Sequence, residues 1–199
     1  MRERRIFIAI ALLCLLSVAA EAQDQDGYDF RKTSWGMSVA QVKASENRVP
    51  LDEDSDATYD KTIVYKESVA GLDATAGYQF ISNKLVRGGY VINELYVNKN
   101  QHIRDYTKIK EILTRKYGAP SIDRIVWIND LFKDDPQDYG TAVSAGHLLY
   151  LSTWQTPSTE ILVTLSGKNF DVALVVVYTD KKSKSLIESR EKAEEEKDF

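Results

Sequence analysis

A predicted helix, whose end is indicated by both a glycine and a proline, divides this sequence into two strand-rich arms. Apolar residues recur three or four positions apart from Ile103 to Tyr117, while most charged residues of the stretch fall between them. This spacing predicts an amphipathic helix over 100–116. Gly118 can adopt the left-handed backbone that closes a helix, and Pro120 cannot continue one. The strands before and after the helix are therefore expected to form two separate sets.

The arm before this helix predicts a short helix and three antiparallel strands. Ser38 is a good N-cap for the short helix. The acidic stretch 52–60 is interpreted as a surface loop, because it lacks the glycine and the closing glutamate of a calcium-binding loop. Gly88-Gly89 predicts curvature or a close backbone approach, with room for a ligand or partner over the sheet as the alternative. Short turns separate the three alternating runs, which are 62–69, 72–81 and 85–96.

The arm after the helix predicts four strands and one long loop. The last strand carries apolar residues on both faces, so it should be central or covered on both sides. The loop, 129–146, is longer than most connections, and loops of this length usually bind something or move. It is therefore the predicted interaction loop, with candidate contacts at Phe132, Asp134, Asp135 and Tyr139. The strands are expected at 122–128, 148–156, 160–166 and 171–178.

These elements predict an α+β fold with two similar arms, 28–99 and 100–180. Each arm is a helix plus an antiparallel meander, and the helices pack on one face of a curved antiparallel sheet. Residues 23–180 are expected to form a single domain, with Trp35, Trp127 and Trp154 in its core. The tail, 181–199, has too few apolar residues for a full stripe and is expected to be helical or disordered.

The N-terminus has the pattern of a secretory signal peptide. Three arginines precede an uncharged apolar run over 6–20, and Ala20 and Ala22 stand three and one residues before a cleavage point at Gln23. A membrane anchor is the alternative, but the run is shorter than the roughly 20 residues that a span needs. A lipoprotein would use Cys14, which lies inside the apolar run after Leu13, where a small residue is expected. Export to the periplasm is the prediction.

Charge and cysteine content exclude several classes of function. The formal net charge of −4 becomes −5 after removal of residues 1–22, which carry a net +1. A mildly acidic chain is a poor candidate for binding nucleic acid or anionic lipid. Cys14 is the single cysteine and leaves with the signal peptide. The mature chain therefore has no disulfide, thiol nucleophile or thiolate metal site.

No pattern of catalytic residues is evident, and no cofactor or metal is expected. His102 and His147 are the two histidines, and neither has a cysteine or a second histidine nearby. Glycine-rich phosphate loops and nucleophile-elbow motifs are absent from the sequence. Asp134-Asp135 could act in acid–base chemistry, but adjacent acids in a polar loop are usually only hydrated. A non-enzyme is expected, and an enzyme with an unrecognised site that uses His147 or Asp135 is the less favoured alternative.

Two short motifs carry a family resemblance. Gly36-Met37-Ser38 followed by Gln41-Val42 resembles the helix start of the outer-membrane assembly lipoprotein BamE and its SmpA/OmlA relatives, and Gly118-Ala119-Pro120 resembles their helix terminator. The resemblance implies helices on one face of a small antiparallel sheet, as in the structurally similar β-lactamase inhibitor proteins, and binding to other proteins. The expected function is a non-catalytic envelope module that binds another envelope protein. A carrier of a small apolar ligand or lipid between sheet and helices is the alternative.

Overall fold

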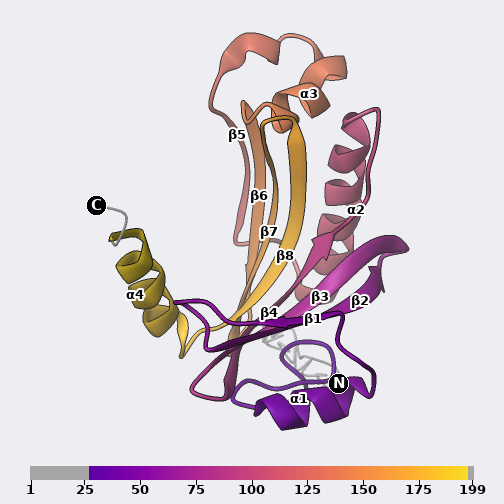
Figure 1. Cartoon of the computed structure of the whole chain (residues 1–199). Helices are drawn as coiled ribbons and strands as arrows, with labels where there is room; N and C mark the ends of the chain where they lie inside the picture. Colours follow the sequence, from indigo (N-terminus) through magenta and orange to yellow (C-terminus); the bar gives the residue numbers. More distant parts are fainter. Residues whose placement is uncertain (1–26, 197–199) are drawn as a thin grey trace, which may run out of the picture.

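The computed structural model describes residues 27–196 and shows an α+β fold (Figure 1). The expected signal peptide, with its cleavage residues Ala20, Ala22 and Gln23, lies outside the described residues. The first half of the chain contains α1 (Val39–Glu46), β1 (Asp52–Asp54), β2 (Lys61–Val69), β3 (Leu72–Ile81) and β4 (Lys84–Ile92). The second half contains α2 (Asn100–Tyr117), β5 (Ile122–Trp127), the 3-10 turns η1 (Asp130–Phe132) and η2 (Pro136–Asp138), α3 (Tyr139–Ser144), β6 (Leu148–Gln155), β7 (Thr159–Lys168), β8 (Asp171–Asp180) and α4 (Lys184–Glu195).

All eight strands belong to one antiparallel sheet in the order β1-β2-β3-β4-β8-β7-β6-β5. Each half contributes a helix followed by a four-stranded meander, and the two meanders meet where β4 pairs with β8. The last strand of each half is therefore central, and the first strand of each half, β1 or β5, lies at an outer edge. This arrangement confirms the predicted α+β fold and the central position of the last strand.

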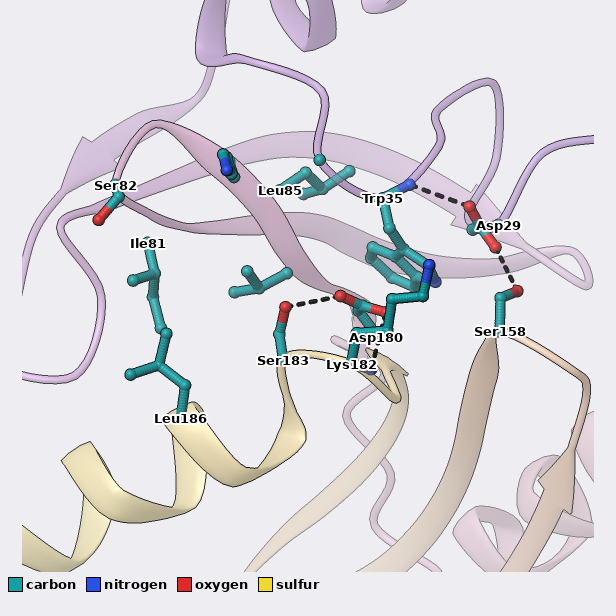
Figure 2. A pocket seen from close by; sticks show the side chains of 13 residues that line it. Asp29, Trp35, Ile81, Ser82, Leu85, Ser158, Asp180, Lys182, Ser183 and Leu186 are labelled. Atoms are coloured by element: carbon teal, nitrogen blue, oxygen red, sulfur yellow. Dashed lines mark hydrogen bonds between the residues drawn. The ribbon is translucent and has the colours of Figure 1, made fainter.

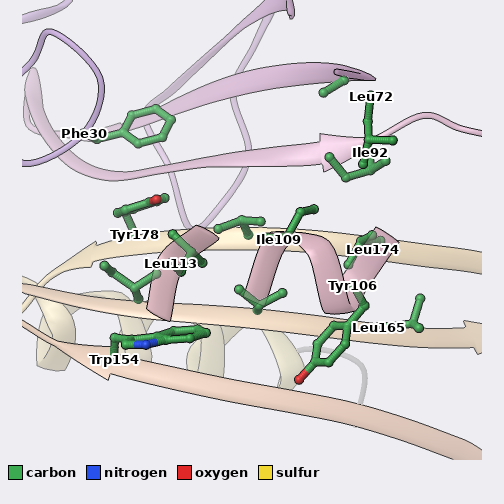
Figure 3. Close-up of a cluster of buried hydrophobic side chains, with 14 of the residues drawn as sticks. Phe30, Leu72, Ile92, Tyr106, Ile109, Leu113, Trp154, Leu165, Leu174 and Tyr178 are labelled. Atoms are coloured by element: carbon green, nitrogen blue, oxygen red, sulfur yellow. The ribbon is translucent and has the colours of Figure 1, made fainter. Parts of the chain in front are cut away.

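Helix α2 supplies much of the core between the two halves of the sheet. Tyr106, Ile109 and Leu113 lie on one stripe of the helix and are 2–6% exposed. In Figure 3 this stripe lies between strands that carry Leu72 on one side and Trp154 on the other. Burying a large apolar side chain stabilises the fold by roughly 1.5–3 kcal/mol. The amphipathic pattern that predicted the helix is thus also what holds the two halves around it.

Helix α1 is joined to the sheet by a half-buried ion network. Arg31 contacts Glu46 at 2.9 Å and Glu67 at 2.5 Å, and Arg48 contacts the same two carboxylates at 2.7 and 2.8 Å. The Tyr78 hydroxyl also donates a hydrogen bond to Glu46. Burial acts to raise the pKa of Glu46, but the Tyr78 hydrogen bond and the two guanidinium groups outweigh it and lower that pKa. Glu46 therefore stays ionised at the point where α1 meets β3.

Three stretches differ from the sequence expectations. Part of the acidic loop, Asp52–Asp54, forms the edge strand β1, because its main chain pairs with Thr62–Val64 of β2. β4 ends at Ile92, and the chain then forms a loop before α2 instead of continuing as a strand. The stretch 129–146 contains η1, η2 and α3, so it is largely ordered in short helical turns. In the last of these stretches, the side chains of Asn129 and Asp135 cap η1 and η2.

Helix α2 ends at a glycine, as the sequence predicted. Gly118 ends α2 with φ 82° and ψ −168°, and its N–H donates to the Thr114 carbonyl at 3.0 Å. The positive φ that favours glycine is present, as expected, although ψ places the residue outside the left-handed helical region.

In the tail, α4 is an ordered helix whose Ile187 is completely buried. Ile187 packs against three apolar residues, Tyr59, Ile81 of β3 and Val86 of β4, and this small cluster docks the otherwise polar helix.

Candidate functional site

The two faces of the sheet differ in what covers them. On one face, alternate side chains from β2, β3, β8, β7 and β6 form the main core with α1, α2 and α3. The opposite face is covered by a helix at one end, where α4 docks, and Figure 1 shows α4 and α2 on opposite sides of β5–β8. Within residues 27–196 no other helix packs on that second face. We call it the open face.

The strand registers place an apolar row across the middle of the open face. Val64 pairs with Gly77, and Gly77 pairs with Gly89. Gly89 in turn pairs with Val177, and Val177 with Leu162. The row therefore crosses five neighbouring strands without a charged side chain. A parallel row beside it contains Thr75, Val91, Val175, Thr164 and Leu151.

A hollow of about 270 Å³ lies in this row. It forms where Gly77 and Gly89 face each other across β3 and β4, because neither residue has a side chain to fill the surface. Val64, Val91 and Val175 are among the residues around it. Val91 is 46% exposed, so its apolar side chain lies at the rim in contact with solvent. The hollow therefore has mostly apolar walls, and Arg87 is the charged residue that lines it.

The lack of a side chain has one consequence at Gly88 and Gly89 and another at Gly77. A Cβ on Gly88 would lie 2.7 Å from Cγ of Phe30, and a Cβ on Gly89 would lie 2.5 Å from the Val176 carbonyl oxygen. A Cβ on Gly77 would meet no atom within 4 Å. Gly88 and Gly89 thus permit close approach, as their position within a strand predicted. Gly77 instead leaves open space above the sheet, which is the alternative that the sequence suggested for the glycine pair.

Helix α4 closes one end of the open face through ion pairs. Arg87 of β4 contacts Glu191 at 2.8 Å, and Arg190 contacts Asp60 at 2.8 Å. The buried Ile187 lies one helical turn before Arg190 and Glu191 and packs the helix against the sheet. These four charged groups pair with one another within the fold, so the polar end of the open face stabilises the docking of α4. The apolar row remains as the part of the face that is available to a partner.

A larger cleft of about 580 Å³ lies beside the start of α4 (Figure 2). Asp29 accepts hydrogen bonds from the Trp35 main-chain N–H at 2.9 Å and from the Ser158 hydroxyl at 2.6 Å. Asp180 accepts one from the Ser183 hydroxyl at 2.6 Å. Both carboxylates therefore stabilise turns that line the cleft. The apolar part of the wall is formed by Trp35, Ile81, Leu85, Val86 and Leu186.

The structure gives the aromatic residues of the predicted interaction loop packing roles. The Phe132 ring lies 5.5 Å from the His147 ring, and the Tyr139 ring lies 5.1 Å from the Trp127 ring, measured between centroids. Phe132 and Tyr139 are partly buried against the main core. Their side chains hold the loop against the sheet, so any contact that they make with a partner would use their exposed edges.

The acidic residues of the same loop are on its surface. Asp134 and Asp135 are exposed, and the Asp135 carboxylate caps η2 by accepting the Gln137 main-chain N–H at 2.9 Å. Two apolar neighbours, Ile128 and Leu131, are 70% and 72% exposed. Sequence reasoning did not single out these two residues, although their apolar side chains stand in an otherwise acidic stretch. They add apolar surface next to the residues that were predicted.

Among residues 27–196 the titratable groups do not gather into a metal site. His102 is 4% exposed, and burial together with the nearby Lys99 lowers its pKa. The partly buried His147 packs on Phe132, and no group among residues 27–196 hydrogen-bonds to its Nδ1. In the same part of the chain, no three His, Cys, Asp or Glu residues come together as metal ligands would. The two histidines lie apart from the open face and its hollow.

Comparisons with known proteins give no relative from which a function could be transferred. No family model matches the chain, and neither a curated protein nor a solved structure matches it. Among the helices of residues 27–196, none is long and apolar enough to cross a membrane.

Proposed function

We propose that this protein is a non-catalytic binding module that engages another protein of the cell envelope through the open face. The observation that carries the proposal is the uncharged row from Val64 to Leu162, which crosses five strands and includes the hollow at Gly77. Contiguous apolar surface of this kind, rimmed by polar residues, is typical of interaction sites on proteins that otherwise have well-filled cores.

The chemistry of the hollow favours a protein partner. Its volume, about 270 Å³, is below the roughly 300–1,000 Å³ that small-molecule pockets usually have. A hollow with apolar walls suits one large apolar side chain of a partner, and such anchors dominate the binding energy of many interfaces. Catalysis would need a nucleophile, a base or a charge-stabilising group at the surface. Gly77, Gly89 and the valines around them offer none of these, and the guanidinium group of Arg87, which also lines the hollow, is paired with Glu191.

The envelope location rests on the sequence. The arginine-led apolar segment and the small residues Ala20 and Ala22 support export and cleavage before Gln23. The short motifs that resemble BamE-type proteins also support an envelope binding module. The loop with Phe132 and Asp134 remains a second proposed contact region.

Site-specific photo-crosslinking in a Gram-negative host tests the proposal. A photoreactive amino acid would replace Val91 on the open face, Asp134 in the loop, or Ile112, which is 36% exposed on α2 and serves as the matched control. We expect Val91 to capture a specific envelope protein that the Ile112 control does not capture. Capture from Ile112 alone, or from none of the positions, would contradict the proposal.

A carrier of a small apolar ligand is the second candidate, and the cleft of Figure 2 favours it. The space between sheet and α2 is filled by Tyr106, Ile109 and Leu113, so a ligand would have to use a different place. The cleft beside α4 has the volume of a ligand pocket and an apolar wall that includes Trp35 and Leu186. Native mass spectrometry of the exported protein would support the carrier if it found a bound apolar molecule that a Leu186→Asp substitution removes.

A further inference from the structure

The two edges of the sheet are protected to different degrees. At one edge, β1 is three residues long and consists of Asp52, Glu53 and Asp54. Short, charged edge strands discourage pairing with another chain. At the other edge, β5 has six residues, and Ile125, at 61%, is its most exposed apolar residue. Ile122 and Val126 are also exposed, so the β5 edge is longer and more apolar than the β1 edge, although Asp123 and Arg124 lie within it.

Hydrogen-bond alternation shows which main-chain groups of β5 face outward. The Ile128 N–H donates to the His147 carbonyl at 2.8 Å, and the register of β5 with β6 continues to this pair. In an antiparallel ladder, alternate residues bond to the neighbouring strand and the residues between them point away. Asp123, Ile125 and Trp127 therefore direct their N–H and C=O groups toward the outer edge. In the described chain no strand pairs with that edge.

We propose that the outer edge of β5 pairs with β5 of a second copy of this chain, antiparallel and centred on Ile125. In this register Ile125 lies opposite itself, and Asp123 lies opposite Trp127 of the second copy. All three outward-facing residues are then paired, which gives about six main-chain hydrogen bonds. The sheets of the two copies become continuous, with their open faces on the same side.

The charges of β5 select this register over its neighbours. Centring the pair on Asp123 or Arg124 would place that residue opposite its own copy, and like charges directly opposite each other destabilise a sheet. Centring it on Val126 would pair Asp123 with Asn129, where the strand has already turned into η1. The register centred on Ile125 instead places apolar Ile122 opposite apolar Ile128. The strand is thus complementary to itself, which argues for a second copy over a foreign peptide.

Sedimentation of the exported protein over a broad concentration series tests this inference. We expect a reversible dimer, and we expect I125K to raise its dissociation constant at least about tenfold, because two ammonium groups then face each other. V97K is the matched control, since Val97 is fully exposed in the loop after β4 and lies outside β5. It should leave the dimer unchanged.

A charge-swap mixture separates self-pairing from other effects of the substitutions. I125K and I125E should each be monomeric alone and should form a heterodimer when mixed, with the far-ultraviolet circular dichroism of both matching the wild type. A wild-type protein that stays monomeric at every concentration would overturn the proposal. So would a mixture that fails to associate, or an equal effect of V97K and I125K.

Discussion

Adding a methyl group at each of two glycines on neighbouring strands should change the free energy of unfolding in opposite directions. Gly88 and Gly77 both lie within central strands, and neither has a positive φ. The Gly88 Cβ would overlap the ring of Phe30, which is 2% exposed and packed 5.1–5.3 Å from Tyr78, Tyr90 and Tyr178. The ring cannot move without disturbing these three neighbours. The Gly77 Cβ would enter open space.

The expected magnitudes follow from these surroundings. Overpacking of this kind costs about 1–3 kcal/mol, so Gly88→Ala should lower the free energy of unfolding by that amount. For a chain of this size the melting temperature should fall by roughly 2–12 °C. Gly77→Ala should stabilise the fold by about 0.5–1 kcal/mol, because alanine loses less backbone entropy than glycine within a strand.

Urea and thermal unfolding of the two variants and the wild type would measure both effects. The reasoning requires the order Gly77→Ala, wild type, Gly88→Ala from most to least stable. A Gly88→Ala variant as stable as the wild type would refute the packing of Phe30 against β4. Gly77→Ala also adds a methyl group to the hollow, so it should weaken partner capture from the open face while the fold is retained.

Further predictions concern the ion network, α4 and the N-terminus. Because Glu46 has a lowered pKa in the folded state, its stabilising effect should be present at neutral pH and lost as the pH falls through that pKa. E46Q should cost about 1.5–3 kcal/mol at neutral pH and little in acid, and equal urea midpoint differences at both pH values would contradict this. I187A should cost about 2–4 kcal/mol, whereas L186A, at a 45% exposed site, should change the unfolding free energy by less than about 0.5 kcal/mol. Intact mass spectrometry of the exported protein should show a chain beginning at Gln23, and an uncleaved N-terminus would contradict the predicted signal peptide.

The sequence predicted the helices and strands better than it predicted which of them pair or pack together. The stripe from Ile103 to Tyr117 and the alternation in β3 predicted α2 and a sheet covered on one face, because both patterns are local. The edge strand β1 was missed, since its three acidic residues have low strand propensity and pair only through their main chain. The docking of α4 was missed as well, because a single buried side chain, Ile187, decides it.

The candidate site could be predicted only in part. The two apolar faces of β8 were visible in the sequence, and the double glycine suggested space over the sheet. The row itself depends on five registers that bring Val64, Gly77 and Leu162 together from distant parts of the chain. No local pattern encodes these registers. Phe132 and Tyr139 were predicted as contacts because they lie in a loop whose length is typical of segments that bind or move, but their packing on His147 and Trp127 depends on tertiary structure.

The affinity of the captured partner for two matched variants tests the central claim most directly. Val91→Asp places a charge beside the hollow on the open face, and Ile112→Asp places the same charge on the exposed side of α2. Binding through the open face predicts that Val91→Asp raises the dissociation constant at least about tenfold, which corresponds to about 1.4 kcal/mol, and that Ile112→Asp leaves it unchanged. Unchanged affinity for Val91→Asp, with loss of binding for Ile112→Asp, would show that the partner binds elsewhere.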